Sequence, residues 1–167
     1  MDNSIKIYVS LLCSLFFMLF ALNSQAQKLH ISQDFNGGTL PTGWTTTAMS
    51  GTQAWSFGAF GSGGFDSSDM AYFDDDALGA SSTNNTASLS SPAFDNSSDS
   101  LTFLDFDYNF RQFNGITDSF IVEVFDGSTW QRVFTVNVDD CGTWTAPNCI
   151  GNFPRASIDI SAYANAN

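Results

Sequence analysis

Hydrophobic and polar residues alternate along several short stretches of the chain, the spacing expected of β-strands that bury one face. The clearest stretches are Leu101–Phe110, Phe120–Phe125 and Trp130–Val136. Asp126-Gly127 lies between the last two, and an Asp-Gly pair between alternating stretches predicts a tight hairpin turn. In the first stretch the alternation slips near Leu104–Asp105, which predicts a β-bulge there.

Shorter β-branched or apolar stretches predict further strands. We expect them at residues 28–35, 45–47, 55–57, 70–73, 87–91 and 156–160. Turn-forming Gly, Pro, Asn and Asp separate them, and no helical period occurs after the first 26 residues. Strands spaced in this way predict an all-β fold, a jelly-roll-like β-sandwich of two antiparallel sheets.

The N-terminus has a different pattern. Lys6 precedes an apolar run from Ile7 to Leu22, and Ser24 and Ala26 supply the small residues of a cleavage site. This layout predicts a Sec signal peptide, residues 1–26, cleaved after Ala26. A transmembrane anchor is the alternative, but the run of about 16 residues is shorter than the ~20 that span a bilayer. We therefore expect one domain, residues 27–167, that is secreted or lies at the cell surface, with no membrane insertion after cleavage.

The charge balance limits the partners of this domain. The chain carries 17 Asp and Glu against 5 Lys and Arg, a formal net charge of −12. Nucleic acid and anionic membranes bind through basic patches, so both are poor partners for this chain. After the leader nearly all the acids are Asp, which favours turns, caps and metal loops over helical surfaces.

Two cysteines follow the leader, Cys141 and Cys149, and both lie in one loop rich in Gly, Pro and Asn. Export leads to an oxidising environment, so we predict a disulfide between them. Closing so short a loop stabilises the fold by about 2–3 kcal/mol. A zinc site would need more ligands than this pair and the distant His30 provide.

Four motifs follow one another along the chain. They are Phe35-(x)5-Pro41-Thr-Gly43-Trp44, Met70-Ala-Tyr-Phe-Asp74 with Ala87-Ser-Leu-Ser-Ser-Pro92, the hairpin around Asp126-Gly127, and Ile158-Asp-Ile-Ser-Ala-Tyr163. Their order and spacing resemble the choice-of-anchor J jelly-roll domains of secreted Bacteroidetes proteins, which are relatives of cleaved-adhesin and MAM domains. The resemblance covers residues 31–163 and implies a jelly roll. The family's closing strands have no counterpart here, so we expect the chain to be the N-terminal part of a longer protein.

The acidic residues suggest a structural calcium ion. Asp74, Asp75 and Asp76 place three carboxylates at a strand-to-loop junction, where like charges repel unless a cation or water screens them. Ca²⁺ takes roughly six to eight hard oxygens, which clustered Asp side chains and loop carbonyls supply. The family resemblance implies Asp34 as a further ligand. A solvated acidic loop is the alternative.

Catalysis finds little support in the sequence. The only His is His30, and neither a Gly-x-Ser-x-Gly elbow nor the Glu pair of sandwich glycosidases occurs. We therefore expect no enzyme within this segment.

Binding is the remaining class. Trp130 and Trp144 are candidate platforms for a sugar ring or a protein ligand, with core packing as the alternative for each. We expect a secreted or cell-surface, non-catalytic adhesion or binding module for an extracellular glycan or protein. Two alternatives remain. One is an accessory domain of a larger secreted hydrolase, a protease or glycosidase whose catalytic part is not in this chain. The other is a spacer that binds nothing.

Overall fold

A computed structural model gives the fold of the chain. It describes residues 28–60, 69–74, 85–112, 118–143, 146–147, 149 and 153–163. The expected signal peptide, residues 1–26, lies outside the described residues. In the part of the chain that is described, no helix has the length and apolar character needed to cross a membrane.

Ten short strands and one turn of 3-10 helix make up the regular structure of the described residues. The strands are β1 (Thr45–Ser50), β2 (Ser56–Gly58), β3 (Met70–Tyr72), β4 (Thr86–Ser90), β5 (Phe103–Asp107), β6 (Phe120–Phe125), β7 (Trp130–Val136), β8 (Gly142–Thr143), β9 (Ala146–Pro147) and β10 (Arg155–Asp159), and the 3-10 helix η4 spans Ser161–Tyr163. The all-β prediction is confirmed.

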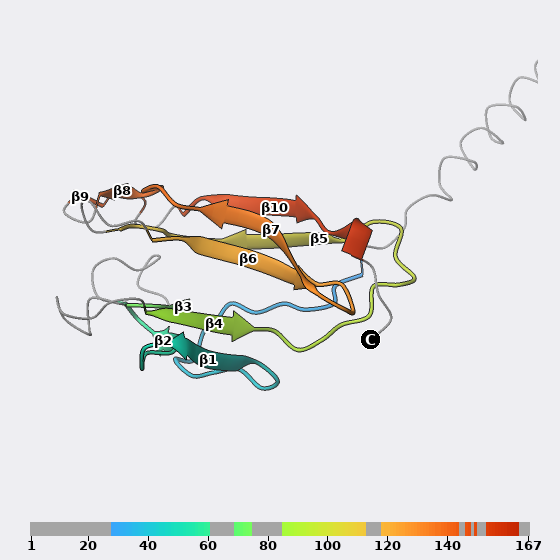
Figure 1. The fold of residues 1–167 in the computed structure, drawn as a ribbon, viewed down its shortest axis with the longest axis horizontal. Helices are drawn as coiled ribbons and strands as arrows, with labels where there is room; N and C mark the ends of the chain where they lie inside the picture. Colours follow the sequence, from blue (N-terminus) through green and yellow to red (C-terminus); the bar gives the residue numbers. More distant parts are fainter. Residues whose placement is uncertain are drawn as a thin grey trace, which may run out of the picture.

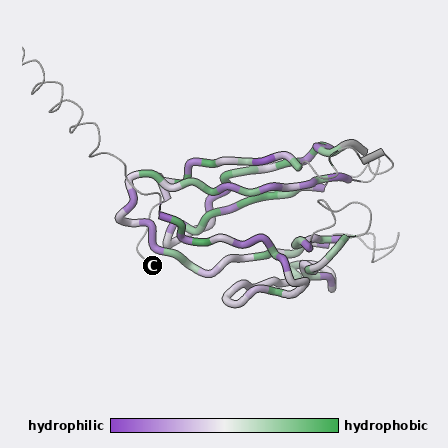
Figure 2. The backbone as a smooth tube through the Cα atoms, turned by 180° about the vertical axis from the view of Figure 1, so that it is seen from behind, coloured by the Kyte–Doolittle hydropathy of each residue, from purple (hydrophilic) through white to green (hydrophobic). Residues whose placement is uncertain are grey.

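The strands associate as antiparallel pairs, β1 with β4, β2 with β3, β5 with β10, β6 with β7 and β8 with β9. Figure 1 shows these pairs in two groups, with β5 to β10 in one and β1 to β4 in the other. Figure 2 shows hydrophobic and hydrophilic residues interspersed along the backbone. Burial alternates residue by residue along β5 and β6, so these strands turn one face toward solvent.

The expected first strand, residues 28–35, is not formed. Side-chain contacts hold this segment instead, because His30 hydrogen-bonds to Asp99 and the Lys28 ammonium lies 3.5 Å from the Asp95 carbonyl oxygen. Phe35 has a φ of 58°, in the left-handed region, where an extended segment cannot continue. Burial alternates from Ile31 to Phe35 as it would in a strand, but no described strand pairs with this segment.

The predicted bulge at Leu104–Asp105 is also wrong. β5 pairs with β10 in unbroken register, from Phe103 opposite Asp159 to Asp107 opposite Arg155. The apparent slip arises because Phe103 lies on the solvent face, where it is 49% exposed. A large apolar residue on the outer face breaks the hydrophobic period without breaking the ladder.

Register irregularities occur elsewhere. β1 shifts register between Ala48 and Ser50, and the β6–β7 hairpin shifts between Val122 and Glu123. A bulge of this kind adds one residue to one strand and increases the local twist.

Aromatic rings connect β5 with the β6–β7 hairpin. The Phe106 ring lies 6.1 Å from Phe120 and 5.3 Å from Phe134 between centroids, and the Tyr108 ring lies 6.0 and 5.2 Å from the same two rings. Such pairs contribute about 0.5–1.5 kcal/mol beyond the area they bury. The two strand pairs therefore contact each other through aromatic side chains.

A second aromatic cluster joins distant parts of the first motif. The Phe35 ring lies 5.0 Å from the Trp44 ring, edge to face, and 5.9 Å from Phe57. The Trp44 N–H donates to the Pro41 carbonyl oxygen at 3.1 Å, and Gly43 has a φ of 83°. Glycine suits the third position of this turn because a side chain there would be strained. The turn thus positions the Trp44 ring against the Phe35 ring.

Candidate functional site

The tip of the β6–β7 hairpin presents two large rings to solvent. Phe125 and Trp130 are cross-strand partners, and their ring centroids lie 5.3 Å apart. Phe125 is 41% exposed and Trp130 is 57% exposed. We call this pair the aromatic platform. Adjacent exposed rings mark surfaces used for contact more often than apolar residues scattered singly do.

The turn between the two strands fixes the platform. The Asp126 carboxylate accepts hydrogen bonds from the backbone N–H groups of Ser128 at 2.9 Å and Thr129 at 2.8 Å, and from the Gln131 side-chain amide at 2.7 Å. These bonds hold the pKa of Asp126 well below its ordinary value, with the backbone donors as the largest cause. A ligand would therefore meet a platform that is already ordered.

Polar groups share the outer face of the hairpin with the platform. Glu123 lies opposite Arg132, with 3.9 Å between the carboxylate Oε1 and the guanidinium Nε. Ile121 follows on the same face, opposite Thr135, and is 39% exposed. The face thus offers ring surfaces together with a hydrogen-bond acceptor and donors, arranged along one hairpin.

The structure places only one of the two predicted platform tryptophans. Trp130 is exposed and belongs to the aromatic platform. Trp144 lies outside the described residues. Phe125 was missing from the sequence prediction, although its position beside the Asp126-Gly127 turn makes it the cross-strand neighbour of Trp130.

Asp34, the first of the predicted calcium ligands, forms hydrogen bonds within its own loop. The exposed carboxylate of Asp34 accepts hydrogen bonds from the backbone N–H of Asn36 at 3.0 Å and from its side-chain amide at 2.9 Å. These bonds lower the pKa of Asp34, the backbone bond most strongly. The carboxylate is therefore ionised at neutral pH.

The Asp34 loop contacts Asp69, because the Asp69 Oδ2 accepts the Gly37 N–H at 3.0 Å. Asp74 follows the other end of β3, roughly 16 Å further along an extended chain. Asp75 and Asp76 lie outside the described residues. Among the described residues, no three His, Cys, Asp or Glu side chains converge in a way that could hold a metal ion. A calcium site that includes Asp34 and Asp74 would therefore need further ligands from outside the described residues.

The predicted disulfide is confirmed. Cys141 and Cys149 are bonded, with 4.9 Å between their Cα atoms, and Cys141 is fully buried. The short strands β8 and β9 lie inside this loop and were not predicted from the sequence.

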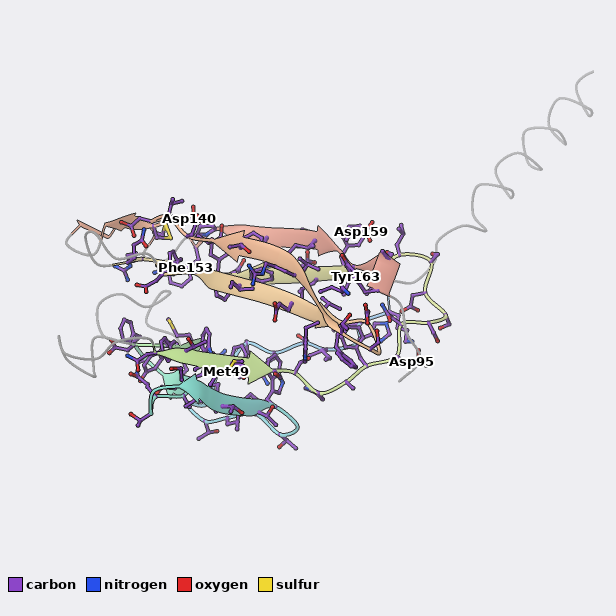
Figure 3. The ribbon with its side chains drawn as sticks, in the orientation of Figure 1. Met49, Asp95, Asp140, Phe153, Asp159 and Tyr163 are labelled. Carbon is purple, nitrogen blue, oxygen red and sulfur yellow. A yellow bond between two sulfur atoms is a disulfide. The ribbon has the colours of Figure 1, made fainter. Side chains whose placement is uncertain are left out.

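Asp140 ties the cystine loop to the end of β5. Its backbone N–H donates to the Phe110 carbonyl oxygen at 3.1 Å, and its carboxylate hydrogen-bonds to the Tyr108 hydroxyl. That bond, with smaller contributions from burial and from the Asp140 charge, raises the pKa of Tyr108 to about 12. Figure 3 shows Asp140 beside the disulfide, at one end of the group of strands that contains β10, with Asp159 at the other end.

Comparison of the chain with protein-family models, with curated proteins and with solved structures found no match.

Proposed function

We propose that the protein is a secreted or cell-surface, non-catalytic binding module that recognises an extracellular glycan through the aromatic platform. The exposed pair Phe125 and Trp130 is the observation that carries this proposal. The C–H faces of a sugar ring are apolar and weakly positive, and they match the negative face of an aromatic ring. Glu123 and Arg132, on the same face, are suited to hydrogen bonds with sugar hydroxyls.

We propose a jelly-roll-like β-sandwich as the architecture that carries the platform. The aromatic contacts between β5 and the β6–β7 hairpin hold these strands together as one group. The two groups of strand pairs in Figure 1 and the resemblance to choice-of-anchor J domains point the same way. In such a fold the outer face of a hairpin is free for a ligand, while its inner face packs in the core.

Glycan binding is tested by replacing Trp130 with alanine. We expect the wild-type protein to bind a subset of glycans on an array and Trp130→Ala to lose at least about tenfold in affinity, as expected when a ring that anchors a ligand is removed. Thermal melts of the two proteins should agree closely, because Trp130 is largely exposed.

Met49→Ala is the matched control, since Met49 is 68% exposed and lies on β1 in the other group of strands (Figure 3). It should bind as the wild type does. Equal glycan binding by wild type and Trp130→Ala would show that the platform is not the site. If the wild-type protein binds no glycan but binds an extracellular protein, the ligand of the aromatic platform is a protein and not a glycan.

We also propose a structural calcium ion that involves Asp34, Asp74, Asp75 and Asp76. The hydrogen bond from the Gly37 N–H to the Asp69 carboxylate supports this proposal, because it brings the loop after Asp34 beside the segment that leads into β3. The ion would hold the loop after Asp34 and the segment after β3 together, and so would stabilise the fold without taking part in ligand recognition.

A further inference from the structure

One edge of β10 has its backbone groups free among the described residues. The β5–β10 ladder extends to the bonds from the Tyr108 N–H to the Pro154 carbonyl oxygen, 3.1 Å, and from the Ile160 N–H to the Thr102 carbonyl oxygen, 2.9 Å. Hydrogen-bonded pairs alternate along an antiparallel ladder, so Ala156 and Ile158 bond to β5. Arg155, Ser157 and Asp159 therefore turn their N–H and C=O groups to the opposite edge.

No described strand pairs with that edge. A free edge is a template for another strand, and proteins that do not use one generally block it with charge, proline or a bulge. Figure 1 shows β10 lying along the margin of its group, remote from β1 to β4.

The charges on β10 allow two copies of this strand to pair antiparallel with opposite charges facing each other. In antiparallel pairing of two copies centred on Ser157, Arg155 of each copy lies opposite Asp159 of the other. The backbone phase allows this register, because all three residues direct their N–H and C=O groups outward. Shifting the centre to Arg155 or to Asp159 would instead place like charges opposite each other, which is destabilising.

Both charged groups retain capacity for a second partner. Asp107 takes the Arg155 Nε at 2.9 Å and the Nη2 at 3.5 Å, which leaves Nη1 available. The Asp159 carboxylate accepts hydrogen bonds from Ser161, the backbone N–H to Oδ1 at 2.9 Å among them, and its roughly four lone-pair sites leave room for a further donor. Hydrogen bonds from Ser161 lower the pKa of Asp159, so it is charged at neutral pH.

The far edge of β5 is a contrasting case. Its outward residues are Phe103, Asp105 and Asp107, by the same alternation. Self-pairing centred on Asp105 would bring two carboxylates together, and Asp107 adds further negative charge. Charge therefore favours self-association through β10 over self-association through β5.

We propose that two copies of this chain associate through antiparallel pairing of their β10 strands, centred on Ser157. The pair would carry two aromatic platforms, and bivalent binding to a surface raises apparent affinity without new contacts. An interface of one short strand is small, below about 1,200 Å², so the association is reversible and depends on concentration. Near 0.15 M salt the Debye length is about 8 Å, which limits the long-range repulsion between two acidic chains.

Sedimentation velocity over a concentration series tests the proposal. We expect a monomer–dimer equilibrium for the wild type, weakened at least about tenfold by Arg155→Asp and by Asp159→Arg, because each places like charges across the interface. An equimolar mixture of these two variants should dimerise again, since every facing pair is then of opposite charge. Restoration in the mixture also excludes unfolding as the cause of the loss.

A backbone variant tests the pairing without a change of charge. Ser157→Pro removes an N–H that points away from β5, a position where a strand tolerates proline, so it should abolish dimers and preserve the fold. Arg132→Glu, which breaks the ion pair between β6 and β7, is the control and should dimerise as the wild type does. Monomers at all concentrations, or single variants that dimerise as well as the wild type, would overturn the proposal.

Discussion

At the scale of single residues, the Asp126 side chain determines the geometry of the hairpin turn. Its carboxylate satisfies two backbone N–H groups, and Gly127 adopts a φ of 90°, which residues with a side chain rarely do. The turn in this way brings Phe125 and Trp130 opposite each other. Stability and the candidate site are therefore coupled through one residue.

Asp126→Ala should lower the melting temperature at pH 7 by a few degrees, because the turn loses its hydrogen-bond acceptor. The pKa of Asp126 is depressed in the folded state, so its contribution is present above the unfolded pKa of about 4. The contribution is lost as pH falls toward the lower, folded pKa. Melts of wild type and variant should therefore converge in acid.

Asp105→Asn is the control for this experiment, because it removes an exposed carboxylate from β5 and leaves the turn intact. A difference between wild type and Asp126→Ala that stays constant from neutral pH into acid would contradict the assigned role of the charge.

The exposure of individual residues could be predicted only in part. Alternation along β6 puts Ile121, Glu123 and Phe125 on one face, as the structure shows. β7 does not continue this pattern, because its register shifts opposite Val122 and Glu123. Strict alternation therefore fails in β7, and the exposure of Trp130 follows from its pairing with Phe125.

At the scale of elements, the hydrophobic period and the turn residues are sufficient to predict a strand pair when its two strands are neighbours in the sequence. The β6–β7 hairpin could be predicted because its two strands follow one another and an Asp-Gly turn joins them. Residues 28–35 show the limit of this reasoning, because that segment was predicted as a strand but is held by side-chain contacts and pairs with no described strand. The pattern reports which face is buried, but not whether a neighbouring strand exists.

The link between the cystine loop and β5 allows a second prediction. A spectrophotometric titration of the wild type should show one tyrosine with a pKa of about 12, Tyr108, and Asp140→Asn should bring that pKa closer to 10. The folded state binds this proton more tightly than the unfolded state does. Its stabilising contribution is thus full below pH 10 and is lost as pH rises through 12.

Tyr108→Phe identifies the titrating group in the same experiment, because it should remove the late-titrating tyrosine from the wild-type curve. A late titration that persists in Tyr108→Phe would assign the shifted group to another residue.

At the scale of the whole molecule, the fold class followed from the sequence but the arrangement of pairs did not. β1 pairs with β4 and β5 pairs with β10, and in both cases the partners are separated by other strands. Alternation carries no information about which distant strand is the neighbour. The aromatic contacts of Phe106 and Tyr108 with the β6–β7 hairpin likewise depend on the arrangement in space.

Calcium gives a prediction at this scale, because its proposed ligands come from segments that the fold must bring together. An ion that binds only the folded state stabilises it by about 2.7 kcal/mol when present at 100 times its Kd. For a domain of this size that corresponds to a rise of roughly 5–10 °C in melting temperature. We expect Ca²⁺ to raise the melting temperature and EDTA to reverse the rise.

Variants distinguish a specific site from general screening of a chain that carries a net charge of −12. Asp74→Asn should reduce the shift produced by Ca²⁺, whereas Asp105→Asn, which removes one charge outside the proposed ligand set, should leave it intact. Mg²⁺ demands smaller, near-octahedral geometry and should stabilise less at equal concentration. Equal shifts with both ions, or identical melts with Ca²⁺ and with EDTA, would mean that the Asp-rich loop is solvated and holds no structural ion.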